Sequence, residues 1–179
     1  MKNVFVTFCL AFLALSATAQ KFGYVNSAQV MSLLPEVKEA NSSLEVFQKQ
    51  YEARLKAMIE DYQQKGMALQ TKVQQGDIAP KQQEIETKQL QELETQIGTL
   101  EQEMRQKVAE KQESLISPII EKLQNAIDSV ASSGGYQYIF DASPGNGILL
   151  YAEQQLDVTP MVMAIMGVSL PEEEPAAEK

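Results

Sequence analysis

The most regular pattern in this 179-residue chain is a stripe of apolar side chains that recur every three or four positions from residue 36 to residue 73. Such spacing predicts an amphipathic helix. From Leu44 onward the steps run three, four and four, a repeat of eleven residues that keeps the stripe straight or slightly right-handed. A left-handed heptad coiled coil is the alternative, but it would place Arg54 and Asp61 in its core. The stripe consists of Val37, Ala40, Leu44, Phe47, Tyr51, Leu55, Met58, Tyr62, Leu69 and Val73.

A second stripe follows a short break at residues 75–80, Gln-Gly-Asp-Ile-Ala-Pro. Asp77 is the expected N-cap of the second helix, and Pro80 is acceptable in a first turn, whose amides lack intrahelical acceptors. The two helices therefore predict an antiparallel hairpin, with an arm over residues 36–117 and a first helix about 55 Å long. Gln89 and Lys111 interrupt a stripe made of Ile85, Leu93, Ile97, Leu100, Met104, Val108, Leu115 and Ile119.

Three residues are candidates for flexibility of the arm. Gly66 falls on the first stripe and Gly98 interrupts good helix formers, and each glycine costs about 1 kcal/mol relative to alanine. Either thin packing at these points lets the arm bend, or the glycines are merely tolerated. Pro118 removes an amide donor and clashes with the preceding turn, so a kink is expected there. The denser apolar face that follows Pro118 predicts packing on a separate base.

The segments that flank the helices read as short strands. Aromatic and β-branched residues predict strands over residues 22–26, 136–141 and 148–152. The glycine-rich turn at 143–147 predicts that the last two form a β-hairpin. The class is therefore α+β, with a body of residues 20–35 and 118–170.

Shorter elements complete the expected body. Residues 28–34 fit a short helix after a capped turn at Ser27, and Pro35 can open the long helix. Thr159 and Pro160 predict the N-cap and first residue of a last helix that Gly167 closes. Residues 171–179 are acidic and without periodicity, which predicts a disordered tail.

The N-terminus indicates export. Lys2, the apolar run 4–15 and Ala17-Thr18-Ala19 are typical of a secretory signal peptide, residues 1–19, cleaved before Gln20. The apolar run is shorter than the roughly 20 residues that a membrane-spanning helix needs. Cys9, the only cysteine of the chain, would leave with the signal peptide.

Composition excludes most catalytic sites. The chain has no histidine, and its single cysteine lies in the expected signal peptide. A Ser-His-Asp triad, a thiolate nucleophile and the usual zinc sites are therefore not expected in the mature protein. Its formal net charge is −9, and an acidic surface repels phosphates, so nucleic acid is not an expected partner. We expect no enzyme activity and no cofactor. Two long arms bury little surface within one chain, which favours oligomerisation.

The remaining charged groups fit a solvated surface. Paired acids lie two positions apart on a helix and point away from each other. The pairs are Glu84/Glu86, Glu92/Glu94 and Glu101/Glu103. A basic patch near the tip of the arm is the alternative, formed by Lys65, Lys72, Lys81 and Lys88, but acidic residues interleave with these lysines.

The order of these elements resembles the Skp (OmpH-like) family of periplasmic chaperones, over the mature chain apart from the tail. Five segments carry the resemblance around the long arms: Phe22-Gly23-Tyr24-Val25-Asn26, Ser32-Leu33-Leu34-Pro35-Glu36, Pro118-Ile119-Ile120, Gly135-Tyr136-Gln137-Tyr138-Ile139-Phe140-Asp141 and Leu156-Asp157-Val158-Thr159-Pro160.

The resemblance implies a periplasmic homotrimer, in which strands from three chains form a central β-barrel and three arms surround a cavity. It implies an ATP-independent holdase that binds unfolded outer-membrane proteins and prevents their aggregation in transit. Relatives are basic, whereas this chain is acidic, which argues against binding of anionic lipid or lipopolysaccharide. A structural coiled-coil adaptor of the envelope with a fixed protein partner is the alternative. The expected oligomerisation residues are Tyr24, Val25, Tyr138, Ile139, Phe140, Leu149 and Leu150.

Overall fold

The computed structural model describes residues 20–145 and 149–169. The expected signal peptide, the acidic tail and residues 146–148 of the expected β-hairpin lie outside these ranges. The described chain divides into two compact units. Residues 35–119 form one unit, and residues 20–34 together with 120–169 form the other.

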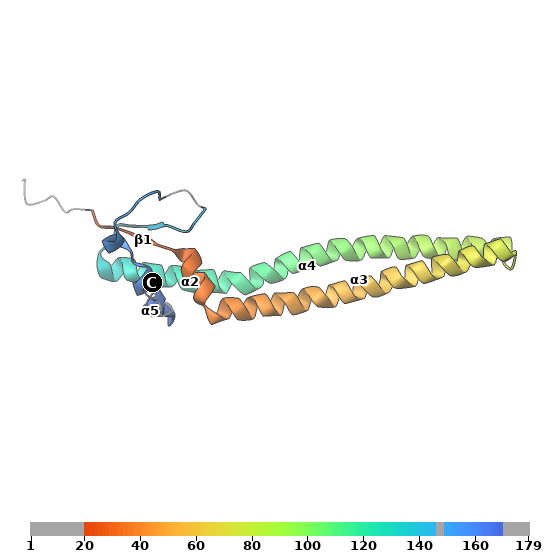
Figure 1. Ribbon diagram of the computed structural model, residues 1–179, viewed down its shortest axis with the longest axis horizontal. Helices are drawn as coiled ribbons and strands as arrows, with labels where there is room; N and C mark the ends of the chain where they lie inside the picture. The colour runs from red at the N-terminus through yellow and green to blue at the C-terminus, as the bar shows by residue number, and fades with distance from the viewer. Residues whose placement is uncertain (1–19, 146–148, 170–179) are drawn as a thin grey trace, which may run out of the picture. The chain divides into compact units, whose positions relative to one another are not determined.

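The unit of residues 35–119 is a helical hairpin. Helix α3, Pro35–Gln75, lies beside the first part of helix α4, Pro80–Gly134, and the two run in opposite directions (Figure 1). The predicted antiparallel hairpin is confirmed. Helix α3 begins at Pro35 because a proline at the first helical position gives up only an amide that would have no partner there.

The turn between α3 and α4 corrects the expected cap. Gly76 adopts φ 74°, the amide of Asp77 donates to the Lys72 carbonyl at 3.0 Å, and that of Gly76 donates to the Val73 carbonyl at 3.2 Å. The backbone amide of Asp77 therefore takes part in closing the C-terminus of α3, next to the left-handed glycine. Asp77 is therefore not the N-cap of α4, which begins at Pro80.

The predicted stripe of α3 is partly buried from Val37 to Leu69. On α4 the prediction holds from Leu93 onward but is wrong near the tip, where Ile85 is 43% exposed and Glu86 and Leu90 are the less exposed residues. Glu86 turns inward because a lysine of α3 binds it. Among residues 35–119 only three side chains are buried: Ala40, Leu100 and Ile119.

The second unit contains a two-stranded parallel sheet. Strand β1, Phe22–Val25, pairs with β2, Tyr138–Asp141, and Phe22 is opposite Tyr138. The other edge of β1 is covered by residues 157 and 158, since the Val158 amide donates to the Tyr24 carbonyl at 2.9 Å.

The predicted β-hairpin is wrong, because residues 149–152 form no strand. The Asp141 side chain accepts a hydrogen bond from the Ser143 amide at 3.0 Å, which turns the chain immediately after β2. The partner of β2 is then the distant strand β1. Leu150 and Tyr151 are left 94% and 83% exposed.

Three short helices complete this unit: α2, Ser27–Leu33, the 3-10 helix η2, Gln154–Leu156, and α5, Thr159–Met166. Helices α2 and α5 contact each other, and α5 also contacts β1. The core consists of Val25, Val30, Leu34, Leu123, Ala126, Val130, Val158, Val162, Met163 and Met166.

Two of the expected helix caps shift by one residue. The N-cap of α2 is Asn26, whose side chain accepts from the Gln29 amide, rather than Ser27. The N-cap of α5 is Val158, because the Thr159 hydroxyl accepts the Asn26 amide at 2.9 Å instead. Closure of α5 by Gly167, at φ 75°, is confirmed.

The Tyr136 ring lies between two glycines. A Cβ atom on Gly134 would be 2.4 Å from the ring, and one on Gly23 would be 3.1 Å from it. The ammonium of Lys21 stands 4.1 Å from the ring centre. These glycines therefore make room for an aromatic side chain where α4 ends.

Gly134→Ala should lower the free energy of unfolding by roughly 1–3 kcal/mol, because the new methyl group forces the Tyr136 ring to move. Gly98→Ala is the matched control on the same helix, where an added Cβ meets nothing within 4 Å. That change should instead stabilise the chain by about 1 kcal/mol. Urea unfolding followed by circular dichroism measures both, and equal effects would contradict the close approach.

Candidate functional site

One face of the small sheet carries a cluster of aromatic rings. Phe22, Tyr138 and Phe140 stack with ring centroids 5.8–6.3 Å apart. Tyr138 is 57% exposed, and the other two residues are exposed as well. Exposed aromatic rings that pack against one another are typical of an interaction surface.

An apolar groove of about 350 Å³ lies beside these rings. It is formed by β1, by β2 and by the segment that leads into η2. Its apolar lining includes Phe22, Tyr24, Phe140, Leu149, Tyr151 and Leu156. Within the described residues the outer edge of β2 pairs with no strand, so a further strand could add there.

The structure separates the expected oligomerisation residues. Tyr138 and Phe140 lie on the exposed aromatic face, Leu149 lines the groove and Leu150 is almost fully exposed. Tyr24 lines the groove and is partly buried, and Ile139 is also partly buried.

Val25 is only 2% exposed and belongs to the core of its own chain. Phe22 and Tyr151 join the surface although sequence reasoning did not select them. Phe22 lies two positions before Tyr24 on the same strand, and residues two apart in a strand share one face of the sheet. This spacing is the sequence signal that could have identified Phe22 as part of the surface.

A polar cluster closes the end of the sheet where both strands finish. The first amides of α2 all find acceptors: Ser27 donates to Asp141 at 3.3 Å, Ala28 to the Ser143 hydroxyl at 3.0 Å, and Gln29 to Asn26 at 3.0 Å. The Ser27 hydroxyl also donates to Asp141 at 2.7 Å. A carboxylate here is favoured by the positive end of the helix dipole.

The hydrogen bonds to Asp141 change its acidity. Partial burial by itself raises the pKa of this carboxyl, but hydrogen bonds from Ser143 and Ser27 outweigh burial and hold the pKa below its ordinary value. A depressed folded-state pKa means that the ionised form stabilises the fold. This contribution is fully present above the pKa of the unfolded chain and is lost as pH falls through the folded-state pKa.

Asp141→Asn should lower the free energy of unfolding at pH 7 by roughly 1–3 kcal/mol, because the donors of Ser27 and Ser143 lose a charged acceptor. The difference between wild type and variant should shrink as pH falls below about 4, where the unfolded aspartate takes up a proton. Urea titrations across pH measure it. Asp128→Asn, at an exposed position of α4, is the control, and a pH-independent difference would contradict the role of the charge.

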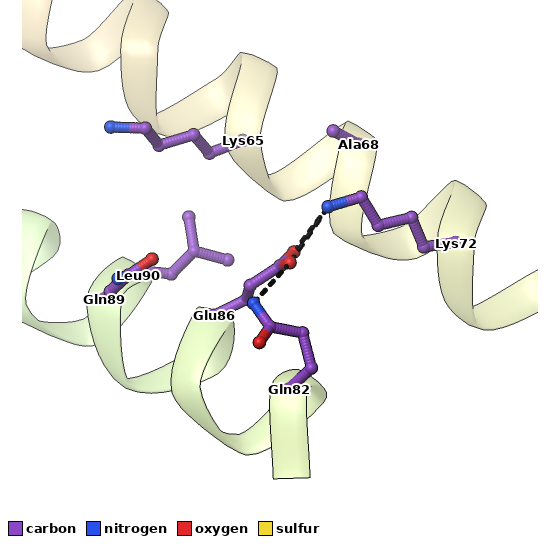
Figure 2. Close-up of a pocket in the computed structure, with 7 residues that line it drawn as sticks. All are labelled: Lys65, Ala68, Lys72, Gln82, Glu86, Gln89 and Leu90. Atoms are coloured by element: carbon purple, nitrogen blue, oxygen red, sulfur yellow. Dashed lines mark hydrogen bonds and ion pairs between the residues drawn. The ribbon is translucent and has the colours of Figure 1, made fainter. Parts of the chain in front are cut away.

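The tip of the helical hairpin holds a second candidate site. A pocket of about 230 Å³ opens between α3 and α4. Figure 2 shows Lys72 of α3 reaching Glu86 of α4, with Leu90 nearby. The two Lys72–Glu86 distances are 2.9 and 3.0 Å, and the Glu86 side chain is 20% exposed. The lining is completed by Lys65, Ala68, Gln82 and Gln89.

This ion pair corrects the expectation of a purely solvated acidic face. Hydrogen bonds from Lys72 and Gln82 hold the pKa of Glu86 below its ordinary value. Elsewhere in the hairpin Tyr51 donates to Glu103 at 3.3 Å. Lys65 is paired with Asp61 at 2.6 Å, so the tip carries a mixed surface rather than a basic patch.

Glu86→Gln should loosen the tip, because it removes the charged contact between α3 and α4. Amide hydrogen exchange of residues 68–90 should become faster, and added salt should speed exchange in wild type more than in the variant. Glu84→Gln, two residues away on an exposed position, should leave exchange unchanged. If both variants behave like wild type, Lys72 and Glu86 do not hold the tip together.

The expected flexibility residues occupy different settings. Gly66 is partly buried on the stripe of α3, and Gly98 is exposed on α4. A Cβ on either would meet nothing within 4 Å. Pro118 lies inside α4, which continues past it to Gly134. Bending at these positions stays a prediction.

In residues 20–145 and 149–169 no group of three or more potential ligands could hold a metal ion. Across the same ranges, no helix combines the length and apolarity needed to cross a membrane.

Comparisons with known proteins agree on one family. The model of the family described as "Outer membrane protein (OmpH-like)" matches residues 21–166. The protein "Chaperone protein Skp" from Yersinia enterocolitica is 30% identical over 156 residues, which cover 84% of this chain and 90% of that protein.

A solved structure shares the fold. It is the crystal structure of a putative outer membrane chaperone (OmpH-like) from Caulobacter crescentus, and it superposes with a TM-score of 0.70 at 17% identity. The superposition covers 84% of this chain and 86% of that one.

Proposed function

Because this chain belongs to the OmpH-like family, we propose that it is an ATP-independent holdase chaperone and not an enzyme. In this proposal it works in the periplasm after loss of residues 1–19. There it binds unfolded outer-membrane proteins and prevents their aggregation during transit. The curated relative named as a chaperone, which matches most of the chain, supports this assignment.

One observation carries the proposal: the two long helices leave most of their apolar stripe incompletely buried. In residues 35–119 only Ala40, Leu100 and Ile119 are buried, although α3 alone has 41 residues. Val46 and Met67 are clearly exposed on α3. A long surface with scattered apolar groups suits many weak contacts with an unfolded chain, none of them essential.

We also propose a homotrimer in which strands of three chains build a central β-barrel. The exposed aromatic face, the apolar groove and the open edge of β2 are the features that support assembly. The proposed participants are Tyr24, Tyr138, Ile139, Phe140, Leu149 and Leu150. We include Phe22 and Tyr151 because they line the same groove. Val25, which is buried in the core of its own chain, would support the trimer only indirectly, by holding β1 in place.

The holdase is tested with a urea-unfolded outer-membrane β-barrel protein diluted into buffer without nucleotide. The mature chain at stoichiometric amounts should abolish most of the light scattering that aggregation produces. An unrelated acidic protein of similar mass is the control. Unchanged aggregation would reject the chaperone. Recovery of one constant partner from envelope extracts, together with that failure, would support the structural adaptor instead.

Assembly is tested by sedimentation equilibrium, where the mature chain should have three times its monomer mass. Tyr138→Glu should raise the dissociation concentration by roughly tenfold or more, since loss of a central aromatic anchor costs about 2 kcal/mol or more. Val46→Glu is the control, because Val46 and Tyr138 are both 57% exposed. A monomeric wild type would contradict the trimer, and equal dissociation by both variants would contradict the role of the aromatic face.

A further inference from the structure

The inference concerns Gln20, the first residue that the structure describes. Gln20 is exposed and makes no hydrogen bond with the other described residues. Lys21, the next residue, is held by two hydrogen bonds. The Lys21 carbonyl accepts the Gln137 amide at 2.9 Å, and the Lys21 ammonium donates to the Gly134 carbonyl at 2.8 Å. Gln20 is thus the last residue before the anchored segment.

Signal cleavage after Ala19 would make Gln20 the N-terminal residue. An N-terminal glutamine has a reactive pair of groups within one residue, its α-amine and its side-chain amide. The amine is partly unprotonated near neutral pH, since the pKa of α-amino groups lies at about 7.7–8.0. The amine can therefore attack its own Cδ atom.

We propose that Gln20 is a modification site, at which the exported chain closes into an N-terminal pyroglutamate. The bond between the α-nitrogen and Cδ forms, the bond between Cδ and the side-chain nitrogen breaks, and one ammonia leaves. No oxidant or reductant takes part. The inference rests on the export in the proposed function, but not on the holdase activity.

Within the described residues, this reaction breaks no hydrogen bond of the fold. Because Gln20 makes no hydrogen bond with the other residues that the structure describes, the ring forms outside the segment that β2 and Gly134 hold. Cyclisation also removes the positive charge of the α-amine. Lys21 then remains the charge that interacts with the carbonyl end of α4, where a cation is favoured.

The ring also protects the strand that follows. Chain ends are preferred points of proteolytic attack, and only Gln20 and Lys21 separate a free N-terminus from β1, which begins at Phe22. An aminopeptidase needs a free α-amine. A pyroglutamate therefore denies these enzymes the residues that lead into the sheet.

The test is the intact mass of the chain isolated from the envelope of the cells that make it. The expected mass is that of residues 20–179 minus one ammonia, and stepwise Edman degradation should not start. Gln20→Ala is the matched control: it should begin at residue 20, yield to Edman degradation and lose residues to an aminopeptidase that leaves wild type intact. Both proteins should suppress aggregation of an unfolded β-barrel protein equally.

Three results would overturn the inference. A chain that begins at Gln20 with an intact amine shows that cyclisation does not occur. A chain that begins at another residue removes the premise about cleavage. An uncleaved chain found in the cytoplasm rejects export as well, whereas a failed aggregation assay with a cyclised Gln20 rejects only the holdase.

Discussion

The parallel pairing of β1 with β2 is the constraint on which the rest of the second unit depends. Parallel strands cannot be joined by a tight turn, and here the connection between them contains α2, α3 and α4. The pairing aligns Val25 with Asp141, so both strands finish at the same end of the sheet. That alignment brings the Asp141 carboxylate to the first amides of α2 and leaves one sheet face to stacked aromatic rings.

Local periodicity was enough to predict the helical hairpin, because its helices are long and their stripes recur over many turns. Closure of α5 by Gly167 was also predicted, and this glycine takes the left-handed conformation that glycine allows. Closure of α3 by Gly76, in the same conformation, was not predicted. Boundaries were less predictable where a side chain serves a distant partner. The Thr159 hydroxyl accepts a hydrogen bond from the Asn26 amide rather than from an amide at the start of α5, and no local signal indicates that choice.

The candidate surfaces were predictable in residue type but not in arrangement. Tyr138 and Phe140 could be selected as exposed aromatic strand residues, yet the glycine-rich turn suggested an antiparallel neighbour after β2. The Asx-type bond from Ser143 to Asp141 and the pairing with β1 prevailed over that local preference. At the tip, the sequence suggested that Glu86 is a solvated acid. Its partner Lys72 lies on the facing helix, and which residues of the two helices face each other depends on the geometry of the turn.

The helical hairpin also determines how β1 and β2 can meet. As an unstructured loop, the connection would impose an entropic cost on strand pairing that grows with the logarithm of its length. Helices α3 and α4 fold back on each other through local contacts and a turn of a few residues, which shortens that loop to the segments on either side of the hairpin. Long-range strand pairing thereby becomes a nearly local event, and the arm contributes to formation of the sheet as well as to the surface it exposes.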